Sequence, residues 1–224
     1  MNMVERRVFQ IVKVNNETED VKTFRLVPIN KKRFKFKSGQ FVNVFCEDAC
    51  KPYSISSSPK AKFLELTIKM INGRMTSKLD KLKEGDEVRI AGPFGDFSFD
   101  AEIVMIACGI GITPMMSHLR CAGKKKITLF YSSRTVKDMI FKKELEKIQK
   151  DCPGLKIVNI ITREKSADAC ENRRFDLEML KKYVENPAEM KYLVCGPIEL
   201  GKNTAEILQK LKVPAENIKK ECWG

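Results

Sequence analysis

The chain contains 224 residues, of which 43% are hydrophobic and 32% are charged. This length suffices for one large domain or for two domains of ~100 residues each, and the hydrophobic fraction excludes a disordered chain. No stretch approaches the ~20 uncharged apolar residues of a membrane span. Residues 1–7 lack the apolar region of a signal peptide, so we expect a cytoplasmic protein without a membrane partner.

The chain is strongly basic, with 42 Lys and Arg against 29 Asp and Glu and a formal net charge of +13. A positive field favours anionic partners such as nucleic acid, phosphorylated cofactors or an acidic protein. The densest basic run, residues 31–37, has two interpretations. It is either a solvated turn with Phe34 and Phe36 folded inward or part of a docking surface for an acidic protein. No nucleic-acid-binding motif accompanies the charge, so we expect no nucleic-acid partner.

The chemistry-bearing residues exclude several classes of site. The eight cysteines are scattered, which is typical of a reduced protein rather than a disulfide framework, and no four of them lie close enough to hold an iron–sulfur cluster. His118 is the single histidine, and we expect it to be structural. We therefore expect neither a metal site nor Ser-His-Asp catalysis.

Residues 1–98 are predicted to form an antiparallel six-stranded β-barrel. Apolar residues take every second place between Leu64 and Met70, as in a half-buried strand. Short strands separated by turns favour a barrel, because closure removes exposed edges. The predicted strands are 8–14, 21–29, 40–46, 52–57, 63–71 and 87–91, with one short helix at 76–82.

Residues 99–224 are predicted to form a doubly wound α/β domain with a parallel sheet of about five strands. After the turn sequence 92–95, continuous apolar runs alternate with amphipathic helices, as in a sheet covered on both faces. The predicted strands are 103–107, 127–131, 157–161, 192–195 and 218–222, and the predicted helices are 114–121, 138–150, 176–184 and 199–211. Ligands bind such sheets at the carboxyl ends of the strands, which we expect to face a cleft beside the barrel.

Three motifs carry candidate chemistry. In Cys108-Gly109-Ile110-Gly111-Ile112-Thr113-Pro114, a buried strand meets a glycine turn and a helix start, where a phosphate can approach the backbone. Lys51-Pro52-Tyr53-Ser54 leads into a serine cluster that suits a flat heteroaromatic ring. Gly73-Arg74-Met75-Thr76 opens the short helix, where Thr76 or Ser77 can cap it and a diphosphate can bind. Taken singly, each is equally consistent with a ligand-free turn or cap.

Together and in this order, the motifs resemble those of the ferredoxin–NADP⁺ reductase superfamily, whose members join a flavin-binding barrel to an NAD(P)-binding domain. Two later motifs, Cys195-Gly196-Pro197 and Glu221-Cys222-Trp223, extend the resemblance over nearly the whole chain. The chain departs from the family pattern at Lys51, which replaces an arginine and loses its bidentate fork, and at Cys108, which replaces a glycine.

The resemblance implies that Tyr53 packs on the isoalloxazine, that Ser54 lies near flavin N5, and that Lys51, Gly73 and Thr76 hold the diphosphate of FAD rather than FMN. Trp223 either stacks on the flavin or is an ordinary surface or core residue. The implied flavin contacts are Lys51, Pro52, Tyr53, Ser54, Ile55, Ser56, Thr67, Lys69, Gly73, Met75, Thr76 and Trp223.

For the pyridine nucleotide, the resemblance implies that Cys195 lies near nicotinamide C4 and that Glu221 orients the nicotinamide amide, so that Ser54, Cys195 and Glu221 form the catalytic set. The alternative for Cys195 is a small buried hydrophobe. Arg163 and Lys165 suit a 2′-phosphate, which favours NADPH over NADH, unless they are merely solvated loop residues. The implied contacts are Gly109, Gly111, Thr113, Pro114, Ser132, Arg134, Arg163, Lys165, Cys195, Gly196 and Pro197.

The sequence therefore predicts an oxidoreductase that transfers hydride between NAD(P)H and FAD and exchanges electrons with an acidic carrier such as ferredoxin or flavodoxin. A reductase component of a larger oxidoreductase complex is the first alternative. A flavin-free basic binding module is the second.

Overall fold

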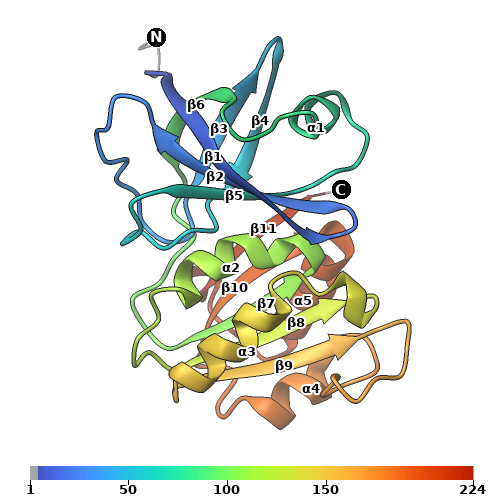
Figure 1. Ribbon diagram of the computed structural model, residues 1–224. Coiled ribbons are helices and arrows are strands. Elements are labelled where there is room, and N and C mark those ends of the chain that lie inside the picture. The colour runs from blue at the N-terminus through green and yellow to red at the C-terminus, as the bar shows by residue number, and fades with distance from the viewer. Residues whose placement is uncertain (1–4, 224) are drawn as a thin grey trace. The chain divides into compact units, whose positions relative to one another are not determined.

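The computed structural model describes residues 5–223, and its contacts divide the chain into two compact units (Figure 1). Unit 1 comprises Met1–Asp96 and Met116–Cys121, and unit 2 comprises Phe97–Met115 and Ala122–Gly224. No helix within residues 5–223 combines the length and the apolar character needed to cross a membrane.

Unit 1 is built on six antiparallel strands, as predicted. Their order in the sheet is β4-β3-β6-β1-β2-β5. An antiparallel bridge between Ile55, which follows β4, and Leu66 in β5 joins the two end strands, so the sheet curls into a barrel. The bounds are β1 Arg7–Thr18, β2 Val21–Pro28, β3 Phe41–Cys46, β4 Ala49–Ser54, β5 Leu64–Lys69 and β6 Glu87–Phe94, with the helix α1 at Arg74–Leu79.

The basic run at residues 31–37 turns its aromatic residues inward. Phe34 is buried and packs edge-on against Phe9, with ring centroids 5.5 Å apart, and Phe36 packs against the same core cluster. The lysines and the arginine of the run are exposed. The solvated-turn interpretation is thus confirmed for the two phenylalanines, and the exposed cations remain available to a partner.

The half-buried interpretation of residues 64–70 was wrong. Glu65 and Thr67, which were expected to face solvent, are only 4% and 3% exposed. The reason is that residues 116–121 belong by their contacts to unit 1, where Arg120 and Ser117 bond to Glu65 and to the serine cluster. Alternation in β5 therefore separates an apolar face from a buried polar face, not from water.

Unit 2 contains a five-stranded, wholly parallel sheet in the order β11-β10-β7-β8-β9, as predicted. Helices α4 and α5 pack on one face in a cluster with Phe130, Val158 and Tyr192, whereas α3 lies across the other face (Figure 1). The strands are β7 Ile103–Cys108, β8 Ile127–Ser133, β9 Leu155–Ile161, β10 Lys191–Pro197 and β11 Ile218–Trp223. The helices are α2 Ile112–Leu119, α3 Lys142–Asp151, α4 Leu177–Tyr183 and α5 Ile198–Lys210.

Several predicted boundaries were wrong by three or four residues, among them the end of the first strand, which was expected at residue 14 and lies at Thr18. The helix expected from residue 138 begins at Lys142, because Thr135 and Asp138 cap a separate short 3-10 turn and Phe141 adopts a left-handed backbone. The strand expected at 52–57 begins at Ala49 and ends at Ser54, because Glu47 and Asp48 form the turn of the β3–β4 hairpin. Hairpin register is not visible in periodicity alone.

Candidate functional site

The Lys51–Ser54 motif lies at the end of β4, which pairs with β3 and stands at one end of the strand order, just before the bridge at Ile55. Successive side chains of a strand point to opposite faces, so Lys51 and Tyr53 share one face and Pro52 and Ser54 share the other. Within residues 5–223, neither the Lys51 ammonium nor the Ser54 hydroxyl has a hydrogen-bond or ion-pair partner, so both are available to a ligand.

Tyr53 is half-buried against the apolar core of the barrel. Burial raises the pKa of the Tyr53 hydroxyl to about 12, with smaller contributions from Cys46 and Cys50. The phenol is therefore neutral at physiological pH, and it offers a flat aromatic surface rather than a charge.

At the start of helix α1, the side chain of Thr76 bonds to the backbone of Gly73. The Thr76 hydroxyl accepts a hydrogen bond from the Gly73 N–H at 3.0 Å, and Gly73 is the N-cap residue. The expectation that Thr76 or Ser77 caps the helix was wrong, because the N-cap residue is Gly73 and Thr76 lies three residues further on, where its hydroxyl bonds to the Gly73 backbone. Arg74 forms an ion pair with Asp48, whose pKa is lowered to about 2 by hydrogen bonds from Lys78 and Arg74.

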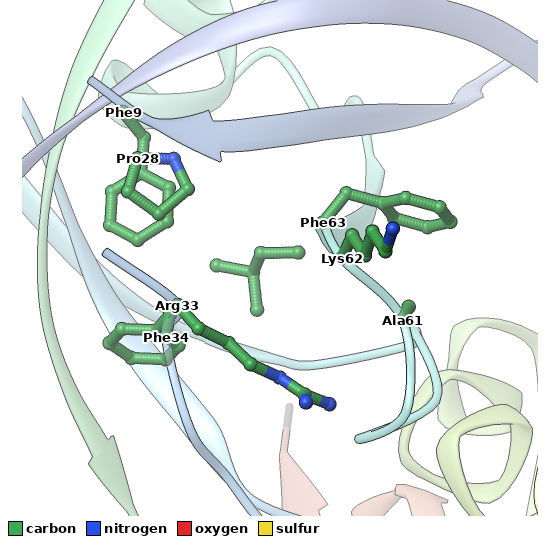
Figure 2. A pocket seen from close by; sticks show the side chains of 8 residues that line it. Phe9, Pro28, Arg33, Phe34, Ala61, Lys62 and Phe63 are labelled. Carbon is green, nitrogen blue, oxygen red and sulfur yellow. The ribbon is translucent and has the colours of Figure 1, made fainter. Parts of the chain in front are cut away.

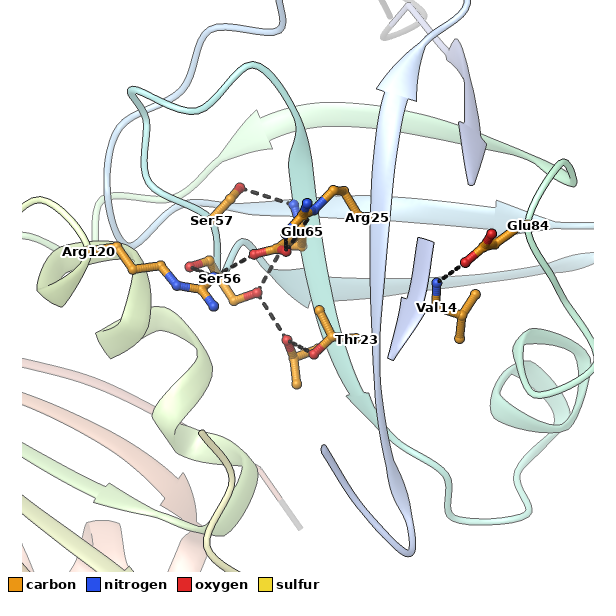
Figure 3. A network of polar contacts seen from close by, with 9 residues as sticks. Val14, Thr23, Arg25, Ser56, Ser57, Glu65, Glu84 and Arg120 are labelled. Carbon is orange, nitrogen blue, oxygen red and sulfur yellow. Dashed lines mark hydrogen bonds and ion pairs between the residues drawn. The ribbon is translucent and has the colours of Figure 1, made fainter. Parts of the chain in front are cut away.

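A buried polar network occupies the serine cluster (Figure 3). Ser56 and Thr67 share a hydrogen bond of 3.0 Å between their hydroxyls, and Thr67 contacts Thr23 at 2.9 Å. The Ser56 backbone N–H donates to the Glu65 carbonyl, and its own carbonyl accepts from Arg120 at 2.8 Å. The polar groups of Ser56 are thus already bonded inside unit 1, which makes a supporting role more consistent with the structure than a direct flavin contact.

Glu65 is the centre of this network and was missed by the sequence reasoning. Its carboxylate accepts from Arg25 Nη2 at 2.9 Å and from Arg120 at 2.7 Å, and the Glu65 N–H donates to the Ser57 hydroxyl (Figure 3). The only sequence signal was an acidic residue in an otherwise apolar and hydroxyl-bearing strand. Arg120 gave no signal, because nothing in the sequence shows that residues 116–121 pack against β5.

The remaining residues implied for flavin binding are buried or already paired. Ile55 is wholly buried in the core, and Met75, on the buried face of α1, is 4% exposed. Lys69, at the end of β5, forms an ion pair with Asp20 at 2.9 Å. A ligand that reaches Lys69 therefore competes with a carboxylate.

The glycine-rich loop of unit 2 lies against the end of β10. A Cβ on Gly111 would stand 2.1 Å from the Cys195 carbonyl oxygen, so only glycine permits this approach. Gly109 has φ +54° with open space where a side chain would point, which leaves its backbone accessible to a ligand. Thr113 is buried and donates to the Ile110 carbonyl at 3.0 Å, whereas Pro114 is buried in the first turn of α2.

Cys195 and Glu221 are paired neighbours on β10 and β11. Cys195 is wholly buried, and burial raises the pKa of its thiol well above the usual value, with Glu221 and Cys222 adding to the shift. Burial also raises the pKa of Glu221. Gly196 adopts φ +155° beside Cys108, and exposed Pro197 pairs with Trp223, which is 43% exposed. Together with the glycine loop, these residues lie at the carboxyl ends of the parallel strands.

The basic residues implied for the nucleotide lie where β8 and β9 end. Arg163 donates from its backbone N–H to the Arg134 carbonyl at 2.9 Å, so the two arginines leave the sheet side by side. Arg134, Arg163 and Lys165 are exposed, and within residues 5–223 their side chains have no ion-pair partner. Ser132 is buried at the end of β8.

A depression in the barrel between Phe9, Phe34 and Phe63 is too small to be a cofactor site (Figure 2). Its volume of about 10 Å³ corresponds to at most one water molecule. Arg33, at its mouth, donates to the Pro59 carbonyl at 2.8 Å. The described residues also contain no group of three or more His, Cys, Asp or Glu side chains that could hold a metal ion.

Two family models match the chain, one for each half. Residues 8–99 match the oxidoreductase FAD-binding domain, and residues 105–206 match the oxidoreductase NAD-binding domain. The chain therefore belongs to the ferredoxin–NADP⁺ reductase superfamily of FAD-dependent NAD(P)H oxidoreductases.

Curated relatives are longer than this chain. It is 31% identical over 236 residues to the reductase component of the glycine betaine monooxygenase of Pseudomonas aeruginosa, covering 98% of this chain and 64% of the relative. It is 26% identical to one component of the Na⁺-translocating NADH-quinone reductase of Marinomonas sp., covering 85% and 52%. The chain thus spans about half to two thirds of the relatives it matches.

Solved structures share the fold at low identity. The FAD/NAD-binding domain of a nitric oxide dioxygenase from Vibrio cholerae has a TM-score of 0.87 and 22% identity, covering 97% of this chain and 98% of that one. A ferredoxin–NADP⁺ reductase from Neisseria gonorrhoeae, solved with FAD and NADP, has a TM-score of 0.82 and 22% identity, covering 98% and 99%.

Proposed function

We propose that the protein oxidises NAD(P)H through bound FAD and delivers the electrons to a partner protein. The observation that carries this proposal is that each unit matches a different cofactor-binding domain: unit 1 an FAD-binding domain and unit 2 an NAD-binding domain. When bound, FAD supplies the conversion between two-electron and one-electron transfer.

The donor groups of unit 1 fit FAD. Tyr53 offers an aromatic surface, the Ser54 hydroxyl is unpaired within residues 5–223, and Lys51 carries a free positive charge for the diphosphate. Gly73 and Thr76, at the start of α1, extend this set. We assign Ser56 and Thr67 the role of holding the β4–β5 junction in shape, because their hydroxyls bond to each other.

The groups of unit 2 fit a pyridine nucleotide. The open backbone at Gly109 and the close approach of Gly111 to Cys195 form a cradle without side chains at the carboxyl edge of the sheet, where nucleotides bind in such folds. In this cradle, Cys195 limits the depth of the nicotinamide pocket and Glu221 orients the carboxamide. Arg134, Arg163 and Lys165 provide the positive charge that a 2′-phosphate requires, which favours NADPH.

The partner is proposed to be an acidic electron carrier or the terminal component of an oxidoreductase complex, in the cytoplasm. Exposed cations at residues 31–37 and a net charge of +13 favour an acidic surface. Two relatives support the second form of partner, one named as the reductase subunit of a glycine betaine monooxygenase and one as a subunit of a Na⁺-translocating NADH-quinone reductase.

A visible spectrum of the purified chain, followed by anaerobic titration with NADPH and with NADH, tests the proposal. We expect a flavin spectrum that bleaches at a lower concentration of NADPH than of NADH. A colourless protein that cannot be loaded with FAD would overturn the proposal.

The flavin pocket is tested by Tyr53→Ala, with Tyr53→Phe as the matched control. We expect the alanine variant to bind FAD at least tenfold more weakly, because it loses the aromatic surface, and the phenylalanine variant to stay within threefold of the parent. Isothermal titration of the apoprotein with FAD measures both. Equal affinities in the two variants would contradict the assigned pocket.

A further inference from the structure

Two loops that follow neighbouring strands of unit 2 are joined by hydrogen bonds beyond the end of the sheet. Thr162 donates from its backbone N–H to the Ser133 carbonyl at 3.1 Å. Arg163 donates in the same way to the Arg134 carbonyl at 2.9 Å. These bonds continue the pairing of β8 with β9 past Ile161, the last residue of β9. The backbones of the two arginines are therefore adjacent, as a shared anion would require.

A side chain makes the next bond between the two loops. Glu164 Oε1 accepts a hydrogen bond from the Val136 N–H at 2.7 Å. Val136 is the first residue of a short 3-10 turn, and the first N–H groups of a helical turn have no partner inside that turn. The Glu164 carboxylate supplies the partner from the other loop, and a bond from a backbone N–H to an ionised acceptor is stronger than one to a neutral acceptor.

Each loop also holds its own half of this contact in place. Asn172 Nδ2 donates to the Glu164 carbonyl at 2.9 Å and to the Ile161 carbonyl at 3.4 Å. In the other loop, the backbone N–H and the hydroxyl of Thr135 donate to Asp138 Oδ2 at 3.0 and 2.9 Å, which closes the 3-10 turn. The bond between the loops therefore joins two segments that are each internally fixed.

Glu164 lies in sequence between two of the cations assigned to the 2′-phosphate, Arg163 and Lys165. Within residues 5–223 its carboxylate bonds to a backbone N–H and forms no ion pair with either neighbour. A carboxylate among cations would by itself oppose anion binding, because it lowers the local positive charge. The bond to Val136 therefore accounts for a carboxylate at this position better than its charge does.

We propose that Glu164 is a positioning residue for the 2′-phosphate of NADPH. It holds the loop after β8 against the loop after β9, so that Arg134 and Arg163 bind one phosphate without a prior rearrangement of either loop. Fixing both loops before the ligand arrives lowers the ordering cost of binding. NADH has no 2′-phosphate and gains nothing from this arrangement. The role rests on the proposed function, because it requires that unit 2 binds a pyridine nucleotide.

Isothermal titration of the FAD-loaded full chain with adenosine 2′,5′-bisphosphate and with adenosine 5′-monophosphate tests this role, since the two probes differ only in the 2′-phosphate. Glu164→Ala is expected to weaken bisphosphate binding about tenfold and to change monophosphate binding less than about twofold. Glu164→Gln keeps an acceptor for Val136 and removes the negative charge, so it is expected to bind the bisphosphate at least as tightly as the parent. Glu185→Ala removes an exposed carboxylate that bonds to neither loop and is the control.

The parent chain separates a failure of this role from a failure of the proposed function. A parent that binds neither probe would overturn the assigned nucleotide site itself. A parent that prefers the bisphosphate, together with a Glu164→Ala variant that keeps the full preference, would overturn only the role of Glu164. Equally tightened bisphosphate binding in Glu164→Ala and Glu164→Gln would also overturn it, because Glu164 would then act through its charge alone.

A double variant shows whether Glu164 acts through its neighbour. In an Arg163→Ala background, Glu164→Ala is expected to weaken bisphosphate binding less than about threefold, because one of the cations that it positions is already absent. An undiminished tenfold loss in that background would contradict the positioning of Arg163 by Glu164.

Discussion

Single residues of unit 2 show how closely the backbone constrains the proposed nucleotide site. Gly111 lies so close to the Cys195 carbonyl that a methyl group cannot be added without moving β10 or the loop. Gly123, in the same unit, has a left-handed backbone but open space at its Cβ position. Alanine substitutions at these two glycines therefore distinguish the cost of a steric clash, at Gly111, from the cost of a strained backbone, at Gly123.

We therefore expect Gly111→Ala to lower the free energy of unfolding by about 3 kcal/mol, because the added methyl overpacks a buried contact. Gly123→Ala should cost only about 1 kcal/mol, the strain of a left-handed alanine. Urea unfolding of the two variants measures the difference. Similar losses in both would mean that the loop relaxes away from Cys195 at little cost.

The exposed arginine at the end of β9 is a second residue with a defined consequence. Arg163→Ala should weaken NADPH binding about tenfold and leave NADH binding within twofold, since only NADPH carries the 2′-phosphate that a guanidinium binds strongly. Lys137→Ala, an exposed lysine on the preceding 3-10 turn, is the control. Equal losses for both nucleotides in Arg163→Ala would remove Arg163 from the 2′-phosphate site.

Among the elements of the fold, β5 and residues 116–121 are linked by an ion pair between Glu65 and Arg120. Glu65 is buried to 4% exposure, and its side chain accepts from two arginines whose own side chains are 35% and 15% exposed. Removing one member of a buried ion-pair network leaves the others without compensation. The stability of this junction therefore depends on Glu65 more than on any single hydroxyl of the network.

Glu65→Ala should accordingly lower the free energy of unfolding by about 3 kcal/mol, near the low end for buried pairs because Arg25 remains partly solvated. The matched control is Glu84→Ala, which removes an exposed carboxylate that accepts a long 3.4 Å bond from the Val14 N–H and should change stability by less than about 0.5 kcal/mol. Urea unfolding with flavin and tryptophan signals measures both. A Glu65 effect no larger than that of Glu84 would show that the network is dispensable.

For the molecule as a whole, the formal charge of +13 affects the rate at which the protein associates with a charged partner. If the partner is acidic, long-range attraction accelerates encounter, and salt screens it, since the Debye length falls from ~30 Å at 0.01 M to ~8 Å at 0.15 M ionic strength. We expect the rate of reduction of an acidic ferredoxin to fall at least tenfold over this range. Reduction of a neutral quinone should change little.

Stopped-flow kinetics at several ionic strengths checks this expectation. A rate of ferredoxin reduction that is independent of salt would argue against an acidic carrier, and it would leave a neutral terminal component as the remaining form of partner. The comparison with the neutral quinone separates encounter from the internal electron-transfer step.

Residue patterns alone were enough to predict the classes of structure and the location of the glycine-rich loop. Alternating and continuous apolar runs distinguish half-covered from fully covered strands, so the six antiparallel and five parallel strands were predictable. The proximity of Gly111, Cys195 and Glu221 also followed, because parallel strands place their carboxyl ends on the same side of the sheet.

Only the tertiary structure shows what covers the second face of β5. It also shows which hydroxyls of the serine cluster have no partner within the described residues. Periodicity reports that Glu65 and Thr67 face away from the apolar core, but it cannot report whether water or Arg120 meets them there. The same holds for Ser54 and Ser56, near neighbours in sequence, of which only Ser56 is bonded inside the barrel. Such outcomes depend on contacts between residues distant in the chain, and local patterns carry no information about those contacts.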